Sequence, residues 1–285
     1  MAEIEDIFMV NKDMAGAAVA GLFVPRTVNS DNDFLMGLNS VHVWGALGWH
    51  DIRQRYRRSV LGPFWFTLST VILVVVLGVL YSALLKQDIS EYLPYLAVGL
   101  IIWQYMAASM NEGCDSFIGS AYLIKQIRMP LTTHVCRIVW RNFIILLHSL
   151  PVAIIILVAF GRWPGVEFLL VPFGLLILLL HGVWIGLVLG VLCARFRDIQ
   201  PIVNSLVQVT FFFTPVMWSP EILKERAWVA EYNPLYHIIE IVRAPIIGRP
   251  IEVESWVWAI LSLVAGFFFA ERLLRRYRDR VPYWL

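Results

Sequence analysis

The sequence predicts an all-α membrane protein with six transmembrane helices. Of its 285 residues, 59% are hydrophobic and only 15% are charged, whereas soluble domains carry about 25% charged residues. The apolar residues are gathered into six blocks without charge. A helix needs about 20 such residues to cross the hydrocarbon core of a bilayer, and most of the blocks reach that length.

The six predicted spans follow these blocks in order. They cover residues 61–85, 92–111, 142–161, 168–194, 199–220 and 253–271. The last uncharged block, residues 255–270, is the shortest. Its span must therefore extend to flanking residues such as Val253 or Glu271, whose carboxylate can reach the membrane surface. Residues 59–285 together form the predicted transmembrane domain.

An abrupt change in composition at residues 53–66 marks the entry to the first span. Four arginines precede the first uncharged block, namely Arg53, Arg55, Arg57 and Arg58. Guanidinium groups remain in water while the following side chains enter hydrocarbon, so this junction is expected at a membrane surface.

Lysine and arginine are divided unevenly between the two sides of the predicted membrane. With the N-terminus inside, 17 of the 23 basic residues fall on the cytoplasmic side, which is the bias that membrane proteins show. We therefore expect a multi-pass protein of the cell inner membrane with both termini in the cytoplasm. Residues 1–30 lack the basic start and apolar core of a signal peptide and are expected to be a mobile cytoplasmic segment.

Residues 31–58 are predicted to form an amphipathic helix on the membrane surface, followed by the basic junction. Apolar residues recur every three positions, at Leu35, Leu38, Val41, Trp44 and Leu47. Tryptophan suits the headgroup layer. The alternative is a soluble helix packed on protein, and the interfacial helix is favoured because a spanning block follows directly.

The segment between the second and third spans has an apolar stripe of its own. Leu123, Ile124 and Ile127 share one face, and Pro130 ends the helix. A short, exposed, amphipathic helix suits docking into a groove of another protein. An ordinary loop packed under the bundle fits this pattern equally well.

The segment between the fifth and sixth spans, residues 220–254, is predicted to lie outside. Pro234 is well placed to begin a helix and Pro245 lies near its end. Apolar residues at i, i+3, i+4 and i+7 between them predict a short amphipathic helix half-sunk in the outer side of the membrane or in protein.

Glycines and aromatic rings mark two further features of the spans. Gly182, Gly186 and Gly190 form a doubled G-x-x-x-G face, which lets two helices approach closely, and a contact within the chain is slightly favoured over one between subunits. Three consecutive phenylalanines, residues 211–213, lie in the middle of the fifth span, where a headgroup belt does not explain them. Aromatic faces pack well on sugars, but lipid-facing or core phenylalanine explains the pattern more simply.

Missing groups exclude several classes of function. No Asp or Glu lies inside the six blocks, although ion-coupled carriers need an ionisable group there. His148 and His181 fit packing roles better than a proton relay. The chain has no G-x-x-x-x-G-K-[ST] phosphate loop, no metal-ligand cluster and no nucleophile elbow. Its three cysteines are scattered and predict neither a disulfide framework nor a metal site.

Several short motifs, in order and spacing, resemble those of ABC-2 type permeases, the transmembrane subunits of ABC exporters for O-antigen, capsule and teichoic acid. They are RYRRSVLGPFW at residues 55–65, RMP at 128–130, RFRDI at 195–199, TPV at 214–216 and NPLY at 233–236. The resemblance covers about residues 35–285 and leaves the N-terminal 30 residues out.

The resemblance implies the type II ABC exporter fold, with short external helices between spans 5 and 6. Two copies of the permease would pair as a homodimer, with spans 1 and 5 of each lining a channel. Two copies of a separate ATPase subunit, which binds ATP and Mg, would dock below, on residues 112–128 and the surface helix. The substrate would be an undecaprenyl-linked polysaccharide moved outward, as in lipopolysaccharide biosynthesis. Membrane lipids are the other partner, and no nucleic acid is implied.

The resemblance also suggests roles for named residues, and this chain itself is expected to carry no catalytic group or cofactor. Lys125, Ile127 and Arg128 would couple the permease to the ATPase. The four arginines at residues 53–58 would hold the membrane surface and attract the pyrophosphate of the substrate, although fixing the topology alone is an equally good role. The candidate channel wall consists of Phe64, Phe66, Tyr81, Phe211, Phe212 and Phe213.

Two other functions stay open at this point. One is an ABC permease for a lipid or a drug, which needs a lateral opening rather than a continuous tunnel. The other is a membrane-embedded glycosyltransferase or acyltransferase, which needs acidic or histidine groups gathered near one membrane face. The external segment does hold such groups, at Glu221, Glu225, Glu231, His237 and Glu240.

Overall fold

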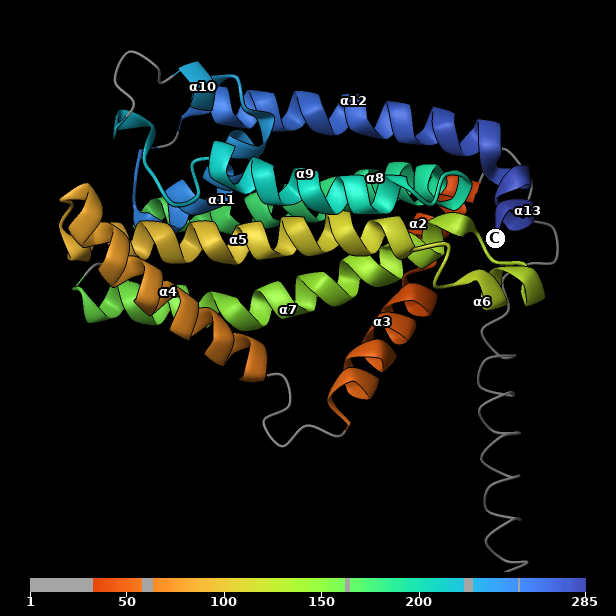
Figure 1. Ribbon diagram of the computed structural model, residues 1–285, viewed down its shortest axis with the longest axis horizontal. Helices are drawn as coiled ribbons and strands as arrows, with labels where there is room; N and C mark the ends of the chain where they lie inside the picture. Colours follow the sequence, from red (N-terminus) through yellow and green to blue (C-terminus); the bar gives the residue numbers. More distant parts are fainter. Residues whose placement is uncertain (1–32, 58–63, 162–164, 223–227, 251) are drawn as a thin grey trace, which may run out of the picture.

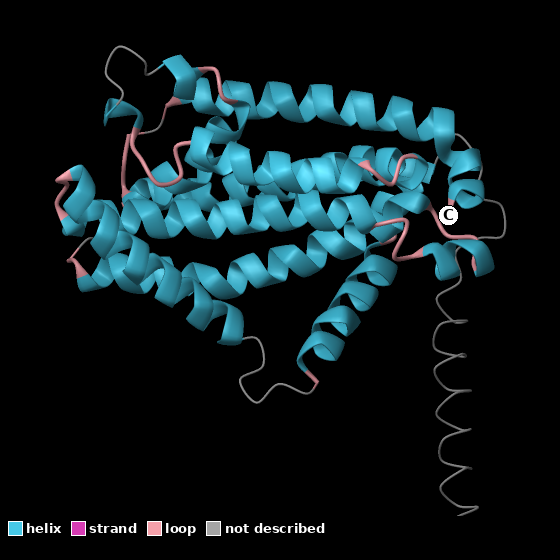
Figure 2. Ribbon diagram, viewed as in Figure 1, coloured by secondary structure: helices cyan, strands magenta, loops and turns pink. Residues whose placement is uncertain are grey.

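The computed structural model describes residues 33–57, 64–161, 165–222, 228–250 and 252–285. Within these ranges the chain is almost entirely helical and contains no strand (Figure 2), which confirms the all-α class. The predictions for residues 1–30, for Arg58 and for Glu225 concern positions outside the described residues.

Five helices in the described part of the chain are long and apolar enough to cross a membrane. They are α4 (Phe64–Leu85), α5 (Ile89–Asp115), α7 (Leu131–Ala159), α8 (Val171–Arg195), which the 3-10 helix η2 (Val166–Leu170) precedes, and α12 (Val253–Tyr277). These match predicted spans one to four and six. The fifth, α9 (Ile199–Phe213), is apolar but has only 15 residues, so the count of six spans stays a prediction.

The fifth predicted span ends as a helix earlier than expected, at Phe213 rather than near residue 220. Thr214 has extended backbone angles, φ −87° and ψ 135°, because the ring of the following Pro215 disfavours the helical conformation for the residue before it. The third span differs in the other direction. Helix α7 begins at Leu131, ahead of the predicted start at 142, since Arg137 and Arg141 lie on the helix and pair with acids on its neighbours.

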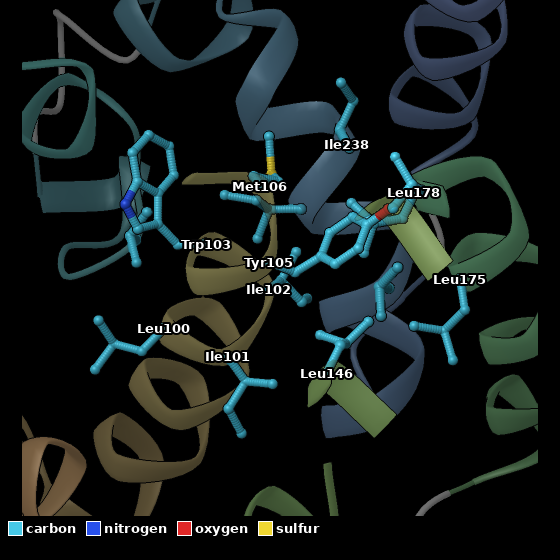
Figure 3. Close-up of a cluster of buried hydrophobic side chains, with 14 of the residues drawn as sticks. Leu100, Ile101, Ile102, Trp103, Tyr105, Met106, Leu146, Leu175, Leu178 and Ile238 are labelled. Carbon is cyan, nitrogen blue, oxygen red and sulfur yellow. The ribbon is translucent and has the colours of Figure 1, made fainter. Parts of the chain in front are cut away.

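Helix α5 is the centre of the bundle. Every residue from Tyr92 to Trp103 is buried, and α5 contacts α4, α7, α8, α9 and the shorter helix α11 (Pro234–Ile247) (Figure 1). Figure 3 shows the resulting core, where Ile102, Tyr105 and Met106 of α5 approach Leu146 of α7 and Leu178 of α8. A helix that is apolar on all sides must be surrounded in this way.

Glycine permits the close packing of α5 on α8. A Cβ atom built on Gly113 of α5 would lie 2.9 Å from the Cα of Gly186, and one built on Gly186 would lie 2.7 Å from the side chain of Val135 in α7. Gly182 and Gly190 occupy the same face, against Tyr105 and Phe117. The doubled glycine motif therefore packs within the chain. Its main partner is α5 with the residues that directly follow it, and α7 is the second.

The N-terminal residues predicted as one surface helix form two, α2 (Asp33–Asn39) and α3 (Val41–Tyr56), which both pack on α7. Asp33 caps the start of α7, because the backbone N–H of Leu131 donates to both of its carboxylate oxygens at 3.2 Å. Arg278 lies 3.6 Å from the same carboxylate. Burial raises the pKa of Asp33, and Arg278 opposes that shift. This one acid therefore joins α2 and α7 to the C-terminal end of α12.

Helix α11 begins at Pro234 as predicted, with the side chain of Asn233 accepting from the N–H of Leu235 at 3.0 Å. It continues past Pro245 to Ile247 and ends where Gly248 adopts φ 71°. Residues 236–246 are all buried, so the helix differs from the half-sunk one predicted. It is enclosed by α5, α8, α12 and η2.

A buried ion pair holds the loop after α9 against α11. The guanidinium of Arg243, which is fully buried, donates to the Glu240 carboxylate at 2.8 and 2.5 Å and to the Pro215 carbonyl at 2.7 Å. Its carbon lies 3.8 Å from the centre of the Tyr95 ring. Burial opposes the charge, but Glu240 and the neighbouring tyrosines outweigh it, and the pKa of Arg243 is raised. Tyr92 donates to the Met217 carbonyl at 2.6 Å.

Changing Gly113 to Ala should destabilise the bundle by about 1–3 kcal/mol, because the new methyl group meets backbone that cannot rotate away. Gly45→Ala is the matched control, since nothing lies within 4 Å of a Cβ at Gly45 and alanine favours a helix by about 1 kcal/mol over glycine. Thermal unfolding of the detergent-purified variants measures the difference. Equal midpoints for the two would contradict the close α5–α8 contact.

Changing Arg243 to Met should cost about 3–5 kcal/mol, because it leaves the Glu240 carboxylate buried without a partner. Adding Glu240→Leu should recover much of that loss, since the pair is then replaced by apolar groups. Arg275→Met is the control, as its pair with Glu271 is exposed and worth at most about 1 kcal/mol. A single variant as stable as the double variant would show that the ion pair does not hold this loop.

Candidate conduit and docking surfaces

Helices α4, α9 and α12 are the least covered of the apolar helices in the described chain. In α4 only a narrow stripe faces inward, made by Thr70, Val74, Gly78 and Ser82, and in α9 only Val207 is buried. Helices α4 and α9 contact α5, one on each side of it in Figure 1. The chain by itself therefore presents long apolar faces on α4, α9 and α12 that lipid, a second protein surface or the wall of a conduit must cover.

The six aromatic residues predicted for a channel wall lie on α4 and α9. Phe64, Phe212 and Phe213 are exposed by 61–66% and Phe66 by 37%, whereas Tyr81 and Phe211 are half-buried. Phe211 packs on Trp103 of α5 with ring centres 5.5 Å apart. A single chain does not bring the six rings together, because the first two begin α4 and the last three end α9.

The basic junction is tied to the bundle by a chain of ion pairs that sequence reasoning missed. Arg55 donates to Glu112 at 3.2 Å, and Arg141 reaches the same carboxylate at 2.6 Å. Arg141 also lies 3.3 Å from Asp51, which pairs with Arg137. These residues are far apart in the sequence and form no local pattern. Arg53 and Arg57, also at the end of α3, are exposed.

The residues predicted to dock an ATPase lie on an exposed corner. Lys125 belongs to α6 (Ala121–Gln126), and Ile127 and Arg128 follow it; all three are exposed, Ile127 by 38%. A surface cavity of about 610 Å³ lies beside them, lined also by Asp279, Pro282 and Tyr283. The C-terminal helix α13 (Val281–Trp284) thus contributes to this corner, with Tyr283 exposed by 88%. No pattern in the sequence predicted that α13 would contribute to this corner.

Two of the groups that suggested an enzyme, His237 and Glu240, are engaged in structural contacts, whereas Glu221 and Glu231 are exposed. The two ring nitrogens of His237 lie 3.0 Å from the Ser255 hydroxyl and 2.7 Å from the Glu231 carbonyl, and Glu240 pairs with Arg243. His181 is likewise held by the Ile177 carbonyl at 2.9 Å and by Ser262 at 3.0 Å. Across the described ranges no group of three or more His, Cys, Asp or Glu could hold a metal ion.

Comparison with known proteins places this arrangement in a family. The chain is 27% identical over 192 residues to the O-antigen export system permease protein RfbA of Myxococcus xanthus, covering 66% of this chain and 74% of that protein. It is 24% identical over 191 residues to RfbA of Klebsiella pneumoniae, with the same coverage. It is also 25% identical over 211 residues to the polysialic acid transport protein KpsM of Escherichia coli, covering 70% and 78% of the two chains.

The match to a family model extends over most of the helices described above. It covers residues 42–247, from α3 through α11, and so includes the basic junction, the exposed α4 and α9 and the clamped loop between α9 and α11. That range is more than half of the chain. This chain belongs to the ABC-2 type transporter family.

Proposed function

We propose that this chain is the transmembrane subunit of an ABC transporter that exports a lipid-linked polysaccharide, of O-antigen or capsule type, across the cytoplasmic membrane. The observation that carries the proposal is the match, over about two thirds of the chain, to relatives named for O-antigen export and polysialic acid transport. ATP would be hydrolysed in a separate subunit. The absence of a phosphate loop from the sequence supports this division of work.

The proposed topology has six spans with both termini in the cytoplasm of the inner membrane. Helix α9 would be the fifth span, and the loop that Arg243 holds would complete its passage to the outer side. Irregular backbone at membrane depth is tolerated where protein surrounds it, and residues 214–217 are buried. The single O–H of Tyr95 lies 3.2 Å from two carbonyls of this loop, those of Pro215 and Trp218, and donates between them.

The proposed conduit needs a second copy of the chain, with two copies of the ATPase subunit below. The uncovered faces of α4 and α9 support this pairing, because two such faces brought together would enclose a path between them. Phe212 and Phe213 would then line its outer part and Phe64 its inner mouth. Aromatic faces would let a glycan slide, since stacking on sugar C–H groups does not depend on one fixed hydrogen-bond pattern.

Coupling would pass from the exposed corner at α6 into α7. Pro130 lies two residues after Arg128 and is the N-cap residue of α7. A displacement of the segment that holds Lys125, Ile127 and Arg128 therefore acts at the end of a helix of 29 residues. Asp33 fixes the same helix end to α2 and Arg278. Closure of the ATPase dimer would therefore rotate α2, α7 and α12 as one body.

Two other functions are less well supported. A permease for a lipid or a drug shares the family, and only the names of the relatives favour a polysaccharide over these cargoes. A membrane-embedded transferase would need free acid and base groups gathered at one site, but two of the five candidate groups, His237 and Glu240, are bonded to neighbours in the structure.

Changing Ile127 and Arg128 together to Asp should abolish co-purification with the ATPase subunit and the stimulation of ATP hydrolysis, because two carboxylates would replace the apolar and basic contacts of an exposed docking corner. Both side chains are exposed, so the permease itself should still fold. Lys86→Asp, at an exposed turn that joins α4 to α5, is the control. A complex that forms and hydrolyses ATP normally would remove this coupling assignment.

Changing Phe212 and Phe213 together to Ala should lower the rate at which polymer reaches the cell surface at least about fivefold, since the two stacking contacts that are lost are worth about 0.5–1.5 kcal/mol each. Surface glycan is measured by antibody binding in cells that make equal amounts of each variant. Phe268→Ala is the control, because Phe268 is equally exposed but lies on α12. Equal export by the two variants would place the phenylalanines in lipid.

A further inference from the structure

We propose that the cavity between α4, α5 and α7 is a binding site for one phosphate-bearing lipid. Its volume of about 680 Å³ lies within the range of roughly 300–1,000 Å³ found for small-molecule sites. The site goes beyond the proposed conduit, because it is built from one chain and needs neither a second copy nor an ATPase. Its two ends differ in chemistry, which is what an amphipathic ligand requires.

The deep end of the cavity, away from its mouth, is apolar. It is lined by Leu73 of α4, by Ile101 and Trp103 of α5, and by Ile145 and Leu146 of α7. Such a surface gains about 25 cal/mol for each Å² of apolar area that a hydrocarbon chain covers. A free phosphate ion or a hydrated sugar would gain nothing from this part of the cavity, so a hydrocarbon chain is the fitting occupant here.

The middle of the cavity carries polar groups that a lipid ester or phosphate could use. Thr70 donates to the Gln104 side-chain oxygen at 3.1 Å. Asn142 lines the cavity and is only 3% exposed, and its amide nitrogen has no hydrogen-bond partner among the described residues. A buried donor without a partner is costly, and ester and phosphate oxygens are acceptors that would relieve this cost.

The mouth of the cavity is basic. Arg55 lines it with its side chain 41% exposed. Among the described residues, one of its five N–H donors is used, in the bond to Glu112. The connected ion pairs behind it contain three arginines and two carboxylates. Arg53 and Arg57 stand exposed on the same helix. The excess of positive charge selects an anionic headgroup at a membrane surface.

Trp103 provides a direct probe, because it lines the apolar end. The full-length protein in detergent is titrated with phosphatidylglycerol that carries brominated chains, which quench nearby tryptophan. Subtracting the quenching of Trp103→Phe isolates the signal from this position. We expect saturable quenching by phosphatidylglycerol, and at least tenfold weaker quenching by phosphatidylcholine with the same brominated chains, whose headgroup carries no net charge.

Three variants connect the signal to the cavity. Arg55→Gln should shift the titration about tenfold to higher lipid concentration, as one charge-assisted contact is lost. Lys86→Gln removes an exposed cation at the other end of α4 that does not line the cavity, and it should leave the titration unchanged. Ser69→Phe and Ala108→Phe should remove the quenching by filling the cavity from α4 and from α5. Ala83→Phe is their control, since Ala83 is exposed elsewhere on α4. Gel filtration confirms that each variant is folded.

Unlabelled undecaprenyl phosphate and unlabelled phosphatidylglycerol are then compared as competitors, which decides between a lipid carrier and a membrane phospholipid as the source of the phosphate. Displacement by either one supports the site. Equal quenching by the charged and the zwitterionic lipid, or quenching that survives both cavity-filling variants, would overturn it. These outcomes do not depend on export, so failure here would leave the proposed function standing.

Discussion

The fully buried charge of Arg243 is the constraint on which the C-terminal half of the bundle depends. A guanidinium can remain in such a place only if carboxylate and carbonyl oxygens surround it, and Glu240 and Pro215 supply them. Meeting that need fixes α11 against α5 and brings the loop after α9 with it. The position of α9 on the outside of the bundle is thus determined at its C-terminal end, where the buried Arg243 binds the Pro215 carbonyl of the loop that follows α9.

Close packing fixes α5, α7 and α8 against one another, as the buried ion pair fixes the loop after α9 against α11. Gly113 and Gly186 allow backbone contact between helices that are otherwise surrounded by apolar side chains, and in lipid such contacts, rather than exclusion from water, stabilise helix association. The result is a rigid centre, with α4 and α9 attached to it along narrow stripes. Helices attached in this way can change neighbours at a small cost, as a conduit that opens and closes requires.

The helices were predictable from the sequence because hydrocarbon imposes a simple rule of length and charge. The ends of the helices were less predictable. Arg137 and Arg141 precede the uncharged block that begins at residue 142 and yet belong to α7, where they pair with Asp51 and Glu112. Thr214 and Pro215 carried a signal for the early end of α9. The burial of α11 was not predictable, because the apolar face that the sequence shows says nothing of the helices that cover the opposite face.

The proposed docking corner and the proposed lipid cavity both border α7, the first at its N-terminal end and the second along residues 142–149. Asp33 and the segment ending at Arg128 meet at the start of α7, and two turns further along that helix Arg137 and Arg141 hold α3, whose last turn carries Arg55. A rotation of α7 would therefore move Arg55 relative to the first turns of α4. A lipid held between Arg55 and α4 would resist that movement. Breaking its phosphate contact would then add to the free energy that the coupling step must supply.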